Sequence, residues 1–492
     1  MKRLIVIGAG MSGLVCGVYA QRSGFRTLML EKAATPGGVS TRWKRKGYTF
    51  EGGIHWLIGS VEGFPLHDIW TETGALQENN PVFFKDPYYT LREGDVTLSL
   101  HRNLDATIKD LEAFSPEDRR ALRRLRRHVR CFQNFHTPVL DLPGLKVRHP
   151  RGFSPLEFIK MLPAVLLTPY LMSLSAGRYL SRIRNPYVRH LLEAVVEPEI
   201  NALSLVYTLS SFSVGDSGYP KGGSLTMALN MARTFRDLGG EIRYNTPAAE
   251  IVRAGDGSLR GVRTAEGFLE ADAVVVSMDA RTAIDKLFVP PLQDGWARGM
   301  RTHLETTQCM FIGLGFRADL SRYPRCTQLW LNRPLQAAGH TYNSLIINNY
   351  ANEKGMAPEG CSTLTLILPG ASYPFWKQAR EEGTYALQKQ AVVDAVADRL
   401  AEAFPETAGA LEASDMATPL TYERYCDTHE GSYMTQWLPG ARTRTAPLKY
   451  RKGIYFTGNR TSFSGGLPIA ADTGRRTAQL LCRDFGAEFV SH

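Results

Sequence analysis

Two short apolar runs frame the start of the chain. The first, Leu4 to Ile7, is followed by a glycine turn and by a stretch with helical spacing from about Ser12 to Ser23. The second, Thr27 to Leu30, ends at Glu31. Short apolar runs bounded by turn residues are typical of buried strands, so this order predicts the first half of a strand–helix–strand unit.

The pattern changes twice further along the chain. From about Gly59 to Ser204, helical spacing dominates among aromatic- and proline-rich stretches, as in an inserted domain. A second α/β stretch starts near Gly222 and reaches a predicted strand at Ala273 to Ser277. The region from about 286 to 439 again alternates predicted strands and helices, and the chain closes on a predicted strand, a glycine-rich loop and a long helix.

The first turn carries a phosphate-binding motif. Gly8, Gly10 and Gly13 form GxGxxG, in which the first glycine permits a tight turn, the second lets the backbone approach a pyrophosphate and the third lets the helix pack closely. We expect Ser12, at the helix start, beside the phosphates. Glu31 follows about 20 residues on, where a carboxylate accepts hydrogen bonds from ribose hydroxyls and disfavours a 2′-phosphate.

Four further segments give the chain a family resemblance. They are Pro36-Gly37-Gly38 with the later KGYTFEGGIHW, the YPKGG run that ends at Gly223, the stretch from Gly240 to Ile251, and the stretch from Tyr455 to Ala471. In this order they resemble the FAD-dependent family of phytoene desaturases, carotenoid isomerases and retinol saturases and, more distantly, the flavin amine oxidases. The inserted regions, which would select the substrate, carry no diagnostic match.

The resemblance implies an α/β fold with non-covalently bound FAD: a discontinuous Rossmann-like FAD-binding domain and an inserted α+β substrate-binding domain. We assign 1–60, 205–285 and 440–492 to the FAD-binding domain, and 61–204 and 286–439 to the substrate-binding domain. The strand after Gly240 would meet the adenine end near Ala248 and Ala249. The expected FAD contacts are Gly8, Gly10, Ser12, Gly13, Glu31, Lys32, Gly38, Arg42, Gly53, Ala249, Gly458, Asn459, Gly466, Leu467 and Pro468.

The C-terminal motif suits the flavin on physical grounds as well. Glycines followed by Pro468 in the first turn of a helix leave free backbone N–H groups and a positive dipole end. These groups favour negative charge at the N1/C2=O2 edge of reduced flavin. Asn459 stands where many relatives carry an acid, and its amide can still donate or accept a hydrogen bond.

Candidate catalytic residues come from the stretch after Gly53, which in the family passes beside the flavin. His55 and Trp56 are expected at the substrate cavity, with His55 as a proton donor to a carbanion-like carbon during reduction of an activated alkene. The alternative for His55 is a hydrogen-bonded core residue. For Arg42, the alternative to a cofactor contact is surface charge continuing into Lys44, Arg45 and Lys46.

We therefore expect an FAD-dependent oxidoreductase that acts on carbon–carbon bonds of an extended hydrophobic substrate such as a carotenoid, isoprenoid or unsaturated lipid, by desaturation, saturation or isomerisation. A flavin amine oxidase is one alternative, for which Tyr433 and Trp437 could form an aromatic cage. A non-enzymatic lipid-binding protein resembling the GDP-dissociation inhibitors is another, but the intact flavin motifs argue against it. No second GxGxxG follows a strand, so the electron partner would visit the same cleft or be oxygen, a quinone or a redox protein.

Charge and cysteine usage narrow the partners and the location. The net charge is +10, and much of the excess lies in an arginine-rich predicted helix from Arg119 to Arg130, interpreted as a solvated face or, alternatively, as a basic patch facing a membrane. No nucleic-acid motif accompanies it. The apolar stretch from Met161 to Gly177 contains two prolines and is expected to be buried or interfacial rather than transmembrane. Seven scattered cysteines indicate a cytoplasmic protein without a metal site. The basic and apolar segments add peripheral membrane contact as an alternative, and the sequence leaves the oligomeric state open.

Overall fold

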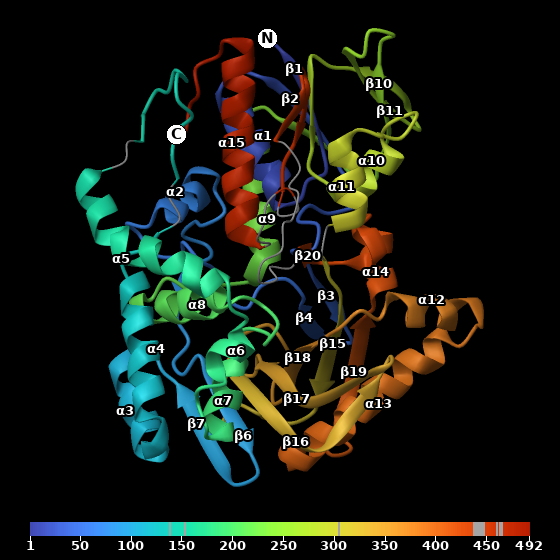
Figure 1. The fold of residues 1–492 in the computed structure, drawn as a ribbon. Coiled ribbons are helices and arrows are strands. Elements are labelled where there is room, and N and C mark those ends of the chain that lie inside the picture. Colours follow the sequence, from blue (N-terminus) through green and yellow to red (C-terminus); the bar gives the residue numbers. More distant parts are fainter. Residues whose placement is uncertain (137–138, 152–153, 304–305, 436–447, 459–460, 462–465) are drawn as a thin grey trace.

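Two β-sheets organise the protein, one above the other in Figure 1. The computed structural model describes residues 1–136, 139–151, 154–303, 306–435, 448–458, 461 and 466–492. Parallel strands with covering helices form the upper part, and a largely antiparallel sheet flanked by helices forms the lower part. This arrangement confirms the predicted α/β fold.

The upper sheet has six strands in the order β21-β22-β13-β1-β2-β9. All neighbours pair in parallel except β21, which pairs with β22 in antiparallel fashion. Strands from both ends and the middle of the chain thus meet in one sheet, while the predicted domain boundaries stay a prediction. The strands are β1 (Arg3–Ile7), β2 (Arg26–Leu30), β9 (Glu241–Arg243), β13 (Ala273–Val276), β21 (Lys449–Arg451) and β22 (Ile454–Phe456).

Strands β1 and β13 alternate their apolar side chains between two cores. Leu4 and Val6 face one core, and Ile5 and Ile7 face the other, as the two-residue period of a strand requires. On the first side lie α1 (Met11–Arg22), α9 (Gly223–Asp237) and α15 (Leu467–Phe485). On the second side lie α10 (Ala280–Lys286), α11 (Gly295–His303) and the small sheet of β10 (Ala248–Arg253), β11 (Leu259–Thr264) and β12 (Gly267–Glu270).

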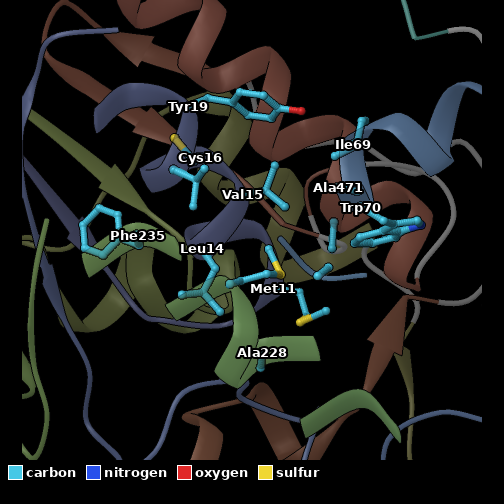
Figure 2. Close-up of a cluster of buried hydrophobic side chains, with 14 of the residues drawn as sticks. Met11, Leu14, Val15, Cys16, Tyr19, Ile69, Trp70, Ala228, Phe235 and Ala471 are labelled. Carbon is cyan, nitrogen blue, oxygen red and sulfur yellow. The ribbon is translucent and has the colours of Figure 1, made fainter. Parts of the chain in front are cut away.

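Helix α1 is the centre of the upper core. Ten of its residues are buried, so it has no polar face. Figure 2 shows its side chains meeting Ala228 and Phe235 of α9, Ala471 of α15, and Trp70 of α2 (Pro65–Glu72). Such complete burial holds the first turn of α1 rigidly between the sheet and two helices.

The lower sheet has seven strands in the order β19-β15-β18-β17-β16-β6-β7. Helices α12 (Tyr373–Glu381) and α13 (Tyr385–Ala403) cover one face. The opposite face receives the hairpin of β3 (Arg42–Arg45) and β4 (Tyr48–Glu51), because Gly313 leaves room for the ring of Phe50. The strands are β6 (Tyr89–Glu93), β7 (Val96–Leu100), β15 (Cys309–Phe316), β16 (Cys326–Ala337), β17 (His340–Asn349), β18 (Ser362–Pro369) and β19 (Leu411–Ala417).

A helical layer closes the left side of Figure 1. It contains α3 (Leu104–Phe114), α4 (Arg119–Phe132), α5 (Pro155–Met172), α6 (Ala176–Leu180), α7 (Pro186–Glu193) and α8 (Ala202–Val214). Within the described ranges, α5 is the single helix long and apolar enough to cross a membrane, and only 17% of it is buried. The apolar stretch that begins at Met161 is therefore mostly an exposed helix surface, which removes the buried interpretation, and the interfacial interpretation stays a prediction.

Candidate functional site

The site lies at the lower edge of the six-stranded sheet. Here the parallel strands end, and α1, α9 and α15 begin, facing the seven-stranded sheet (Figure 1). In open α/β sheets, ligands bind in the crevice beyond the carboxyl ends of the strands. The predicted cofactor residues converge on this edge from four segments of the chain.

The GxGxxG turn has the geometry that a pyrophosphate needs. Gly8 has a φ of +100° and donates its N–H to Leu30 O at 2.8 Å. A Cβ added at Gly13 would lie 2.1 Å from the carbonyl oxygen of Gly8, so only glycine lets α1 pack this closely. A Cβ at Gly10 would meet no atom within 4 Å. The backbone at the start of α1 is therefore open to a ligand, and FAD fits this site.

Glu31 anchors the same turn from the second strand. Its two carboxylate oxygens accept the N–H groups of Ala9 at 2.7 Å and Ala33 at 2.8 Å. Burial raises the pKa of Glu31, and these backbone hydrogen bonds oppose the rise. Thr246 donates its N–H to the carbonyl of Glu31 at 2.9 Å, which brings the strand that carries the exposed Ala249 towards the predicted adenine end.

Two other predicted motifs pack onto the first turn. Gly37 donates its N–H to Ala9 O at 2.9 Å, and a Cβ at Gly38 would lie 3.7 Å from the Cα of Gly10. From the C-terminal segment, a Cβ at Gly458 would lie 3.3 Å from the Oγ of Ser12. The structure thus brings three separate glycine motifs around the N-terminus of α1.

Helix α15 begins at this edge as predicted. Gly466 caps it with a φ of +97°, a conformation that favours glycine, and Leu467 and Pro468 form its first turn. Among the residues that the structure describes, no side chain caps this end by a hydrogen bond, so its first backbone N–H groups are available to an anionic ligand edge. Asn459 lies outside the described residues, as does Trp437.

Gly53 packs against the first turn of α9 and against Ser40. A Cβ there would lie 2.0 Å from the Oγ of Ser224 and 3.0 Å from the Cα of Ser40. Beside it, the buried Glu51 accepts hydrogen bonds from the Oγ of Ser224 at 2.9 Å and the N–H of Gly53 at 3.2 Å. Burial raises the pKa of Glu51 to about 7, although these bonds and nearby Arg42 oppose the rise.

Arg42 and Lys32 have protein partners. Arg42 stands opposite Glu51 on the β3–β4 hairpin and donates to the carbonyl of Gly222 at 3.0 Å, just before α9. It lies inside the site rather than in the exposed run that follows it. Lys32 forms an ion pair of 3.0 Å with Asp427 and is 37% exposed. Direct contact of either side chain with FAD stays a prediction.

The two predicted catalytic residues lie between the sheets, and both are half-buried. Burial and the charges of Lys85 and Arg325 together lower the pKa of His55 to about 4. A hydrogen bond with Asn348 opposes this change. The ring of Trp56 meets that of Phe212 on α8 at 5.5 Å, edge to face. The imidazole of His55 is therefore uncharged at neutral pH, and Trp56 begins an aromatic path into the helical layer.

Sequence reasoning did not identify three groups of this site. Ser277 directly follows β13, and its Oγ lies 2.8 Å from that of Ser12. Its position at a strand end was a usable signal. Glu51 stands two residues before the predicted Gly53, but its burial depends on Ser224 from a distant segment. Lys85 had no local signal, since only the folded chain carries it to His55.

Comparison with known proteins agrees with this geometry. The family model described as "Flavin containing amine oxidoreductase" matches residues 11–482.

The chain belongs to the flavin containing amine oxidoreductase family.

Like its family, the protein is an FAD-dependent oxidoreductase, as the glycine motifs predicted. It is 24% identical over 513 residues to a chloroplastic prolycopene isomerase of Daucus carota, with 98% of this chain and 80% of that protein covered. It is also 24% identical over 514 residues to a lycopene-forming phytoene desaturase of Pseudescherichia vulneris, with 98% and 100% covered.

Solved structures agree on the fold. Cyclohexylamine oxidase from Brevibacterium oxydans matches with a TM-score of 0.60 at 18% identity, covering 99% of each chain. An oxidoreductase from Methanosarcina mazei matches with a TM-score of 0.61 at 16% identity, covering 96% of this chain and 98% of that one. At such identities the likeness concerns the fold alone.

The residues divide the work of holding FAD by position. Glu31 would hold the ribose, the open backbone at Gly10 would accept the pyrophosphate, and the start of α15 at Gly466 would face the flavin edge that carries negative charge. When bound, FAD supplies a hydride acceptor and donor at its N5 atom. The stretch from Gly53 to Trp56 reaches the lower sheet through the hydrogen bond of His55 with Asn348.

Proposed function

We propose that this flavoenzyme acts on carbon–carbon bonds of a polyene or related isoprenoid, by desaturation, saturation or isomerisation. The observation that carries the proposal is similarity along 98% of the chain to relatives whose names state lycopene formation or prolycopene isomerisation. Similarity that includes the inserted regions bears on the substrate, because those regions line the side of the site away from the nucleotide.

The aromatic path from the site supports an extended apolar substrate. The rings of Trp56 and Phe212 lie 5.5 Å apart, and Phe212 stacks on Tyr88 at 3.8 Å with an interplanar angle of 9°. These rings lead from His55 towards α8, against which α5 packs. A conjugated chain that binds beside Trp56 would meet apolar ring surface and would require no hydrogen bonds.

Product analysis tests the proposal and separates its three forms. The holoenzyme would be incubated with phytoene, prolycopene or retinol in vesicles. The polyenes would then be separated by chromatography and their masses measured by mass spectrometry. Loss of a hydrogen pair indicates desaturation, gain indicates saturation, and altered retention at constant mass indicates isomerisation. Unchanged polyenes, together with amine-dependent peroxide release, would instead favour the amine oxidase alternative.

We further propose that the protein works at the surface of a membrane, with α5 as the contact. The large apolar side chains that α5 exposes are Leu156, Phe158, Ile159, Leu162, Val165, Leu166, Tyr170 and Met172, from 36% exposed at Tyr170 to 72% at Leu166. A surface of this kind inserts into the boundary between headgroups and acyl chains, where a hydrophobic substrate is dissolved.

The arginine-rich helix α4 supports the same orientation. Four of its arginines pair with acids of α3: Arg119, Arg123, Arg126 and Arg130. Arg124 instead donates to the hydroxyl of Tyr170 on α5 and lies 5.5 Å from its ring centre. Positive charge thus borders the apolar surface, which complements anionic lipid headgroups. The free cysteines fit a cytoplasmic location, so the proposed membrane face is the cytoplasmic one.

Vesicle flotation with paired variants tests the membrane contact. Leu166→Glu should weaken binding to anionic vesicles by about tenfold or more, because about 1.5–3 kcal/mol of side-chain burial is lost and a charge is added. Leu387→Glu is the matched control, since Leu387 on α13 is 69% exposed but remote from α5. Equal binding by wild type and Leu166→Glu would contradict this contact.

A further inference from the structure

Lys85 is a half-buried lysine whose amine is hydrogen-bonded to the proposed reaction site. Its Nζ donates to the carbonyl oxygen of His55 at 2.8 Å. Lys85 follows β5 (Val82–Phe83), which pairs with β8 (Tyr219–Pro220), and β8 leads into the glycines that start α9. The amine is therefore held between the strand that enters α9 and the backbone beside Gly53, with both segments belonging to the flavin site.

The charged and aromatic groups around this amine come from the lower sheet and from β8. Arg325 and Cys326 lie at the start of β16, and Arg325 pairs with Glu353 at 3.3 Å. The amine lies 5.8 Å from the ring centre of Tyr219. Burial, and then the charge of Arg325, lower the pKa of Lys85 to about 7, while Cys326 and Glu353 oppose the change.

His55 in the same setting lacks the acidic proton of an imidazolium ion. Its imidazole is uncharged at neutral pH, since burial and the neighbouring cations Lys85 and Arg325 hold its pKa near 4. A group that exchanges a proton at the working pH needs a pKa close to that pH. Lys85 meets this requirement, whereas His55 is suited to hold its hydrogen bond with Asn348 and to orient the backbone that Lys85 binds.

We infer that Lys85 is the proton-transfer residue of the flavin site, acting at the substrate carbon next to the one that exchanges hydride with the flavin. This inference rests on the proposed carbon–carbon chemistry. In desaturation, two C–H bonds break: one hydrogen leaves with its electron pair to FAD, and the neutral amine of Lys85 takes the other as a proton while the C=C bond forms. In saturation, the ammonium returns that proton as hydride arrives from reduced FAD.

Competitive acetylation followed by mass spectrometry tests the placement without any turnover. The holoprotein and the protein stripped of FAD would be labelled across a pH series, with the exposed Lys377 as internal reference. We expect labelling of Lys85 to be half-maximal near pH 7 without FAD and to fall when FAD is bound. Labelling of Lys85 that is the same with and without FAD, or that follows the pH dependence of Lys377, would overturn the inference.

Anaerobic bleaching of the flavin by phytoene in vesicles provides the kinetic arm. Lys85→Gln should slow bleaching by roughly 10²-fold or more and abolish the inflection near pH 7, and Lys85→Arg should also lose that inflection. Lys377→Gln is the matched control. An unchanged inflection in Lys85→Gln would refute the role. If phytoene bleaches no variant, the proposed substrate fails while the labelling result still decides the placement of Lys85.

Discussion

Alanine substitutions at two glycines of the first turn should have separable effects on FAD binding and on the stability of the fold. Alanine at Gly10 meets no atom within 4 Å, and the φ of −68° at this position is ordinary for alanine. The apoprotein should keep its stability or gain about 0.4–1 kcal/mol, because alanine restricts the unfolded chain. The added methyl occupies space beside the pyrophosphate, and overpacking of about 1–3 kcal/mol corresponds to roughly 5- to 150-fold weaker FAD binding.

Alanine at Gly13 should behave differently. Its Cβ would lie 2.1 Å from the carbonyl oxygen of Gly8 and 2.9 Å from the Oγ of Ser277, so backbone must move. We expect a loss of about 1–3 kcal/mol in the free energy of unfolding of the apoprotein, besides weaker FAD binding. Urea unfolding of the apoproteins and titration with FAD measure both quantities. A Gly10→Ala protein that binds FAD like wild type, or that is as unstable as Gly13→Ala, would refute the reasoning.

Two further predictions concern buried charge. Asp141→Ala should lower the free energy of unfolding by about 3–5 kcal/mol, since it leaves the guanidinium of Arg475, 1% exposed and 2.7 Å away, without its carboxylate. Glu488→Ala removes an exposed ion pair and should cost about 0–1 kcal/mol in the same chemical denaturation; similar losses would be inconsistent with this contrast. Burial holds the pKa of Glu51 at about 7 against 4.5 in the unfolded chain, so the unfolded state releases its proton first as pH rises. The free energy of unfolding of the apoprotein should therefore fall by about 3 kcal/mol between pH 4.5 and about pH 7 and stay flat above that range. Glu51→Gln should remove this slope in a pH series of unfolding curves. A slope that persists in the variant would exclude Glu51 as its source.

Local patterns were enough to predict the nucleotide-binding half. Strand β1 and helix α1 begin and end within a residue or two of their predicted limits. Both the apolar periodicity and the GxGxxG turn depend only on residues close together in the sequence. The contacts of Gly37 with Ala9, and of Gly458 with Ser12, join motifs far apart in the chain. Those could be expected only through the family resemblance.

The groups that set the electrostatics of the site were beyond sequence reasoning. Burial is the largest cause of the lowered pKa values of His55 and Lys85, and Arg325, which lies just before β16 of the lower sheet, lowers both further. Nothing in the neighbouring residues of any of the three marks this meeting. In the sequence, the two prolines of the apolar stretch argue against a transmembrane helix, but Pro163 and Pro169 are accommodated inside an 18-residue helix whose surface is largely exposed.

The visible absorption spectrum of the purified protein, recorded anaerobically while a polyene is added, tests the central claim most directly. The account predicts an oxidised flavin spectrum, FAD released on denaturation, and chemical change of the polyene supplied in vesicles, with bleaching of the oxidised flavin where the reaction is desaturation. A colourless protein that takes up no added FAD would contradict the assignment of the site. A flavin that amines bleach, in a protein that leaves every polyene chemically unchanged, would contradict the proposed carbon–carbon chemistry.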